Sequence, residues 1–268
     1  ILHLDGTCEG DTPQLISAMD EISSLVLGNI KLPSEKAATL IPFLKKLQAD
    51  YGNPLALVYD MGGGILDAVA TVFPETPDYI CHFHFLRDIG KDLLNNPYQQ
   101  FAKQLKNTKI KAELKKLAKK LSHEISLLTE ESAARTKAEL ERTYTLTLWI
   151  LDFSSELDGY GFPFDRAHWV FYERLQKVNS TLKIIHEQVP FLTASSLQDL
   201  YRIVNMIDSQ AEILEYVVIL RERIPIFEEL RAAMRIACPG NSQGLKDHGE
   251  DTAVEMESIE VQLTKFKE

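Results

Sequence analysis

The sequence predicts an α/β protein in which a mixed sheet comes first and a large α-helical part follows. Up to about residue 94, short apolar runs and turn residues alternate with helical patterns. Beyond it, glycine is almost absent up to residue 237, and apolar residues recur at helical spacing. We therefore divide the chain into a sheet region at 1–94, a helical region at 95–237, and a loop with the start of a further helical segment at 238–268.

Three strands are expected first, and their order suits a meander. The third contains Gly28-Asn29, which predicts a turn or a bulge inside it. The expected strands are Ile1–Asp5, Pro13–Met19 and Ser24–Leu32.

Helices then alternate with two more strands. We expect Ser34 to cap a helix that ends at Gly52. The nearly continuous apolar run 54–60 is typical of a strand buried on both faces. We expect a loop at 62–64, which lacks the Lys-Ser/Thr of a phosphate-binding P-loop. A short helix at 65–73, a strand starting at 79 and a helix around 86–94 complete the region.

Asp5 and Asp60 are the candidate catalytic pair. Right-handed crossovers would make the first and fourth strands central neighbours, so both acids would sit at carboxyl ends of strands, where α/β sheets bind ligands. Carboxylates suit Mg²⁺ or Mn²⁺, and two such ions about 4 Å apart assist phosphodiester displacement. The alternative is that each acid only serves a turn or caps a helix.

Cys81 and His84 form a Cys-x-x-His motif, in which Cys81 belongs to the last expected strand, and we expect this strand to lead through His82 and His84 into the next helix. A structural zinc site needs four ligands, and only Cys8 and His3 offer themselves as completions. The alternative is a buried thiol with a hydrogen-bonded histidine nearby. Arg87, one turn into the next helix, is placed to face a phosphate.

A lysine run lies between residues 103 and 120. It contains eight lysines and one glutamate, and we expect one helix with leucines on its other face. Either it is a solvated surface, or it contacts nucleic-acid phosphates. The candidate contacts are Lys103, Lys106, Lys109, Lys115, Lys116 and Lys119.

Composition is that of an ordinary soluble globular protein. The chain has 45% hydrophobic residues, with 29 basic and 39 acidic side chains, which give a net charge of −10. This excludes a wholly disordered or collagen-like chain, and the acidic balance argues against a surface that binds nucleic acid everywhere. No apolar run approaches the roughly 20 residues that span a bilayer, so no transmembrane helix is expected. Three cysteines favour a reducing compartment, the cytoplasm. Since the chain opens with Ile1 inside an expected strand, we expect an internal piece of a longer protein.

Three segments in order, Leu4–Thr7, Val58–Gly62 and Cys81–Asp88, resemble the catalytic core of a DDE transposase. The resemblance is to the bacterial and Mutator-like branch, which has a Cys-x-x-His motif. It implies a ribonuclease H-like mixed sheet interrupted by a large all-α insertion. It also implies that Asp5 and Asp60 bind two Mg²⁺ or Mn²⁺ ions for DNA strand cleavage and transfer at transposable-element ends.

The resemblance further implies a homo-oligomer acting on DNA, with no membrane, and a nucleoid association if the protein is bacterial. A third acid, a glutamate, should follow the insertion; Glu173 comes too early for this role, so we expect the third acid beyond Glu268. Three alternatives stay open. One is a ribonuclease H-like nuclease that cuts without joining, and another is an inactive transposon-derived protein that binds DNA or partners. The third, outside the resemblance, is a helical scaffold with a small α/β domain.

Overall fold

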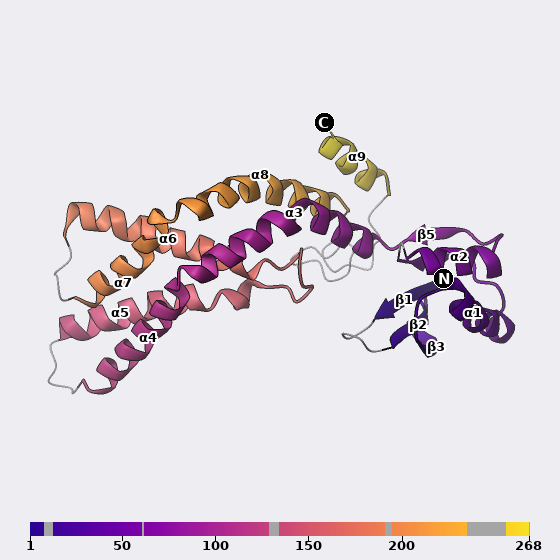
Figure 1. Cartoon of the computed structure of the whole chain (residues 1–268), viewed down its shortest axis with the longest axis horizontal. Coiled ribbons are helices and arrows are strands. Elements are labelled where there is room, and N and C mark those ends of the chain that lie inside the picture. The colour runs from indigo at the N-terminus through magenta and orange to yellow at the C-terminus, as the bar shows by residue number, and fades with distance from the viewer. Residues whose placement is uncertain (8–12, 61, 129–133, 191–194, 235–255, 268) are drawn as a thin grey trace. The chain divides into compact units, whose positions relative to one another are not determined.

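The structure, a computed structural model, describes residues 1–7, 13–60, 62–128, 134–190, 195–234 and 256–267 (Figure 1). It shows an α/β protein with one five-stranded mixed sheet and many helices, so the predicted fold class is confirmed at that level. The chain divides into two compact units, Ile1–Ile89 and Gly90–Glu268, which are called here the sheet unit and the helical unit. Each is described by itself.

The strand order in the sheet is β3-β2-β1-β4-β5. Strand β2 is antiparallel to β1 and to β3, whereas β4 is parallel to β1 and to β5. The prediction that the first and fourth strands are neighbours is therefore confirmed. The strands are β1 (Leu2–Thr7), β2 (Gln14–Asp20), β3 (Leu25–Leu32), β4 (Leu57–Tyr59) and β5 (Asp78–Ile80).

The predicted bulge in the third strand is also present. Gly28 pairs with Ala18, but the next residue of β2, Met19, pairs with Val26, so that Leu27 is the extra residue. A bulge adds local twist to the strand that carries it.

Helices α1 (Ala37–Tyr51) and α2 (Gly63–Val72) pack on each other and share the sheet unit's core. Leu2 and Leu4 of β1 are buried in this core. Because side chains alternate along a strand, His3 and Asp5 belong to the opposite face. This places the polar residues of β1 away from the hydrophobic core.

Two expected boundaries in the sheet unit are wrong. Helix α1 begins after Lys36, not after Ser34. Gly63 and Gly64, expected in a loop, form the first residues of α2. The backbones approach closely here, because a β-carbon on Gly64 would lie 1.7 Å from the carbonyl oxygen of Glu35. Only glycine allows this helix start to pack against the loop before α1.

The helical unit consists of long helices (Figure 1). Helices α4 to α7 contact one another, and Arg223 of α8 donates a hydrogen bond of 2.8 Å to the carbonyl oxygen of Leu93 in α3. The described elements, counting α3 from its start in the sheet unit, are α3 (His82–Asn107), α4 (Ile110–Ser126), α5 (Ala134–Leu151), η1 (Phe153–Glu156), α6 (Ala167–Gln188), α7 (Ser196–Asn205), η2 (Met206–Ser209), α8 (Ala211–Met234) and α9 (Met256–Lys267).

The lysine run does not lie on one helix, contrary to the prediction. Helix α3 ends at Asn107, and Lys109 adopts a left-handed conformation with φ 59°. The backbone N–H of Ile110 donates to Oγ1 of Thr108 over 3.2 Å, which satisfies a group left open at the start of α4. The lysines therefore divide between two helices.

Buried charges of the helical unit are paired. Arg174 contacts Glu156 at 2.6 Å, and Arg231 contacts Asp158 at 3.0 Å, with only 6% and 2% of the two arginines exposed. Arg166 contacts Glu228 at 2.5 Å. Such pairing is what allows a charged group to be buried.

No described helix is both long and apolar enough to cross a membrane.

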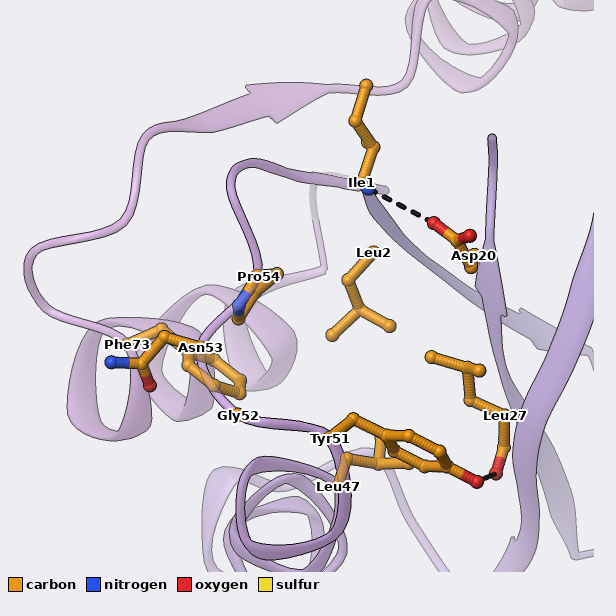
Figure 2. A pocket seen from close by; sticks show the side chains of 10 residues that line it. All are labelled: Ile1, Leu2, Asp20, Leu27, Leu47, Tyr51, Gly52, Asn53, Pro54 and Phe73. Carbon is orange, nitrogen blue, oxygen red and sulfur yellow. Dashed lines mark hydrogen bonds and ion pairs between the residues drawn. The ribbon is translucent and has the colours of Figure 1, made fainter. Parts of the chain in front are cut away.

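The sheet unit has a small pocket of about 260 Å³ beside the first residues of β1 (Figure 2). Leu2, Leu27 and Leu47 line it, and at its margin the hydroxyl group of Tyr51 donates to the carbonyl oxygen of Leu27. This mainly apolar pocket is at the opposite end of β1 from Asp5.

Candidate functional site

The two candidate acids follow the same register position on neighbouring parallel strands. Leu4 of β1 pairs with Tyr59 of β4, and Tyr59 pairs with Ile80 of β5. The residues that directly follow these positions of β1, β4 and β5 are Asp5, Asp60 and Cys81. Parallel strands lie about 4.8 Å apart, so these residues form one row at the carboxyl edge of the sheet. Within this row, Ser17 of β2 pairs with Asp5.

Each acid has a defined neighbour. The Nε2 atom of His84 lies 3.5 Å from Oδ1 of Asp5, whose side chain is 55% exposed. The Oδ1 atom of Asp60 accepts a hydrogen bond of 2.9 Å from the backbone N–H of Gly62, which fixes that carboxylate over the turn into α2. Both side chains are thus held while an oxygen of each stays available.

Glu35 is a third carboxylate at this edge, and sequence analysis did not select it. A β-carbon built on Gly6 would lie 2.3 Å from Oε1 of Glu35, and one on Gly62 would lie 3.7 Å from Oε2. Burial raises the pKa of Glu35, and the negative charges of Asp60 and Asp5 raise it further. The Glu35 carboxylate therefore lies among the backbones and charges that surround both aspartates.

A topological signal for Glu35 exists in the sequence. In a meander, the first and third strands end at the same edge of the sheet. Leu32, the last residue of β3, pairs with Gln14 at the start of β2, close in the chain order to the end of β1. An acid three residues after β3 is therefore brought to the edge that carries Asp5.

The motif residues occupy the same edge, but the predicted strand through His82 and His84 is wrong. Helix α3 begins at His82, immediately after Cys81. The backbone N–H of Cys81 donates to the carbonyl oxygen of Tyr59 over 2.7 Å and so prolongs the pairing of β5 with β4 by one residue. His84 is carried by the first turn of the helix and is 8% exposed.

Cys81 and His3 interact across the strands. Burial alone would raise the pKa of the Cys81 thiol, but hydrogen bonds from His3, from the backbone at the start of α3 and from the side chain of His84 outweigh it and lower the pKa to about 6. The same hydrogen bond is the main cause that raises the pKa of His3 to about 9, and burial opposes it. Cys8, the other proposed zinc ligand, is outside the described residues.

The described ion pair of Arg87 is with its neighbour in the chain, Asp88. Its Nε lies 3.5 Å from Oδ1 of Asp88, and the side chain is one-third exposed. Nothing among its described contacts joins it to Asp5 or Asp60.

The lysines of the predicted phosphate-contact surface differ in their partners. Lys116 contacts Glu113 at 2.7 Å. Lys103, Lys109 and Lys119 are exposed. These four positions have the features of a solvated surface.

Lys106 and Lys115, which are exposed too, belong with Lys111 and His168 to what we call the basic cluster. Burial lowers the pKa of Lys111, and the charges of Lys115 and Lys106 lower it further. Burial, Lys106 and Lys111 likewise lower the pKa of His168. The Nζ of Lys111 also lies 4.3 Å from the ring centroid of Phe153. Positive charge is therefore concentrated here, and sequence analysis missed Lys111 and His168.

Oxygen donors at the sheet edge fit a hard divalent cation. Three carboxylates gather there, and burial, followed by the negative charges of Asp60 and Asp5, raises the pKa of Glu35. Among the residues that the structure describes, no group of three or more His, Cys, Asp or Glu is already arranged to hold an ion. The carboxylates would have to turn toward a cation to bind it.

Comparison with models of known protein families finds no match to this chain, and comparison with curated proteins finds none either.

Proposed function

We propose that the chain is the catalytic region of a DNA transposase with a ribonuclease H-like sheet, which cleaves and transfers DNA strands at the ends of a transposable element. The observation that carries the proposal is the placement of Asp5 and Asp60 one residue beyond a paired position of two parallel strands. The reaction type, phosphoryl transfer on DNA, is inferred from the resemblance of the three sequence segments to DDE transposases.

Asp5 and Asp60 would hold the Mg²⁺ or Mn²⁺ ions. When bound, these ions supply Lewis-acid activation of the attacking oxygen and stabilise the charge on the leaving oxygen. The chain's own residues prepare this site: His84 restrains Asp5, and the Gly62 N–H restrains Asp60. The position of a further acid beyond Glu268 stays a prediction.

The proposed reaction has two displacements at phosphorus. In cleavage, a water oxygen forms the new P–O bond, and the bond to the 3′ oxygen breaks and leaves a 3′-hydroxyl. In transfer, that hydroxyl attacks a phosphorus of target DNA and displaces another 3′ oxygen. The basic cluster supports the proposal with positive charge for DNA phosphates, and paired ends would be held by a homo-oligomer.

Nicking of supercoiled plasmid DNA by the full chain, with Mg²⁺ or Mn²⁺, tests the catalytic proposal. We expect Asp5→Asn and Asp60→Asn to lower nicking by about a thousandfold, since each removes a charge opposite the reacting phosphate. Asp67→Asn, at an exposed position of α2, is the matched control and should nick normally. Unchanged nicking in both site variants would refute the proposal.

A second candidate is a transposon-derived protein that binds DNA without catalysis. It is favoured by the basic cluster together with the lack of a formed metal-binding group among the described residues. In that case DNA binding would depend on Lys106, Lys111 and Lys115, and no divalent cation would produce nicks. A joining assay with precut ends separates a transposase from a nuclease that only cuts.

A further inference from the structure

The basic cluster collects positive charge from three helices. Its members are Lys106 in the last turn of α3, Lys111 and Lys115 in the first two turns of α4, and His168, the second residue of α6. Lys111 and Lys115 are four residues apart, so their side chains lie on the same face of α4. Because the charges of Lys106 and Lys111 act on His168, the end of α3 and the starts of α4 and α6 lie close together here.

Two contacts with aromatic residues position the cluster. The Nζ atom of Lys111 lies 4.3 Å from the ring centroid of Phe153, which is a cation–π contact. The backbone N–H of His168 donates a hydrogen bond of 3.1 Å to the hydroxyl group of Tyr98, and the centroids of these two rings lie 6.3 Å apart. An ammonium group and an imidazole ring are therefore held in place by the fold itself.

Among the residues that the structure describes, no ion pair joins the basic cluster to an acid. On the same helix, α4, Lys116 contacts Glu113 at 2.7 Å. By contrast, the charges that lower the pKa of Lys111 and of His168 are all positive. The chain has 39 acidic and only 29 basic side chains, so acids are plentiful. Like charges gathered in this way repel one another, and an anionic ligand would remove that cost.

We propose that the basic cluster is an anion site, which takes one phosphate group of the DNA backbone and binds it more tightly when His168 is protonated. The inference rests on the proposed function, because DNA is the substrate of that function. It adds to that function a defined phosphate contact in the helical unit and a dependence of DNA affinity on pH. The three lysines supply constant positive charge, whereas His168 supplies a charge that changes near neutral pH.

The sign of the pH dependence follows from the surroundings of His168. Burial and the charges of Lys106 and Lys111 lower its pKa, so the ring of the free protein is mostly neutral at pH 7. Tyr98 and the ion-paired Arg166 are further groups beside it. A bound phosphate offsets the positive charges and raises this pKa. The gain in DNA affinity is then complete below the pKa of the free protein, and it is lost as pH rises through the pKa of the complex.

Binding of a short fluorescent DNA duplex to the full chain, measured by anisotropy in EDTA, tests the inference without catalysis. Between pH 8 and pH 5.5, wild type should gain about threefold to tenfold more affinity than His168→Gln does, because glutamine takes up no proton. His123→Gln, at an exposed position of α4, is the matched control and should gain as much as wild type. An equal gain in His168→Gln and wild type would refute the coupling to His168.

The lysines are tested by the salt dependence of the same binding. Lys111→Gln should weaken binding by about tenfold and lower the slope of log affinity against log salt by about one, since a phosphate loses its cation. Lys115→Gln should act in the same direction. Lys183→Gln, at an exposed position of α6, removes the same charge outside the cluster and should leave the slope unchanged.

A second measurement separates DNA from free phosphate. The histidine ring signals of the isotope-labelled full chain are followed by NMR against pH, and the signal that is missing in His168→Gln belongs to His168. The DNA duplex should raise the pKa of this ring, whereas inorganic phosphate at the same phosphate concentration should leave it nearly unchanged. If inorganic phosphate raises this pKa and DNA does not, the site takes a free anion, and the inference is overturned.

The outcomes distinguish this inference from the proposed function. If Lys111→Gln and His168→Gln bind DNA as wild type does at every pH, the anion site is refuted, while nicking that requires Asp5 and Asp60 still supports the transposase proposal. If DNA affinity depends on the basic cluster but no divalent cation ever produces nicks, the anion site is supported, and the transposase proposal fails.

Discussion

The sheet unit and the helical unit treat charge in opposite ways. In the helical unit, Arg174 and Arg231 are almost completely buried, and both have acidic partners within 3.0 Å. In the sheet unit, Asp5, Glu35 and Asp60 gather at one edge with a single histidine in contact. Buried charges with opposite partners stabilise the fold, whereas like charges held together at strand ends are typical of sites that act on a ligand.

Loss of a buried arginine should have the largest effect on stability. Arg231→Ala leaves Asp158 without its arginine partner at a site where the arginine is 2% exposed, and we expect a loss of roughly 3–5 kcal/mol. Arg202→Ala, whose side chain is 75% exposed and 3.7 Å from Asp199, should cost about 1 kcal/mol or less. Urea unfolding measures both. Equal losses would mean that the buried pairs do not support the helical unit.

Two glycine substitutions compare the stability cost of an added β-carbon in the helical unit and in the sheet unit. In Gly90→Ala, the β-carbon would lie 2.4 Å from Pro163 and 2.5 Å from Phe227, inside a packed core, and should cost about 1–3 kcal/mol. In Gly6→Ala, the nearest atom is the mobile tip of Glu35, so the cost should be under about 1 kcal/mol. Urea unfolding of the two variants decides this. If Gly6→Ala loses more free energy of unfolding than Gly90→Ala, the position of Glu35 is rigidly required for folding.

Sequence reasoning succeeded where structure follows from local pattern. The apolar runs and short connections of the sheet unit predicted its strands, and the crossover rule made β1 and β4 neighbours. The bulge beside Gly28 was also visible, because glycine inside a strand marks such a site.

The errors concern effects that local pattern does not contain. Helix α2 begins at Gly63, and its second residue, Gly64, packs against Glu35, a residue distant in sequence. The leucine spacing of the lysine run continues past Thr108, which hid the end of α3. The edge position of Glu35 depends on the third strand's direction, so it becomes visible only after the whole sheet is assembled.

Removal of the Glu35 charge should raise the stability of the protein, whereas removal of a buried arginine should lower it. In EDTA at pH 7, Glu35→Gln should slightly raise the midpoint of thermal unfolding, because a carboxylate destabilised by burial and by Asp60 and Asp5 is gone. Added salt should shrink the gain, since it screens the repulsion. A drop in the midpoint at low salt would show that the carboxylate is structurally satisfied, as the arginines of the helical unit are.

The smallest expected effect concerns one proton at the same edge. With the pKa of Cys81 lowered to about 6, its thiolate should form as pH rises from 5 to 7.5. The absorbance difference at 240 nm between wild type and Cys81→Ser isolates this thiol from the other two cysteines. His3→Leu removes the hydrogen-bond donor, so the transition should move upward toward the ordinary thiol pKa. A wild-type transition near pH 9 would mean that the sheet unit does not hold Cys81 as a thiolate, and would limit its unbalanced charge to the three carboxylates.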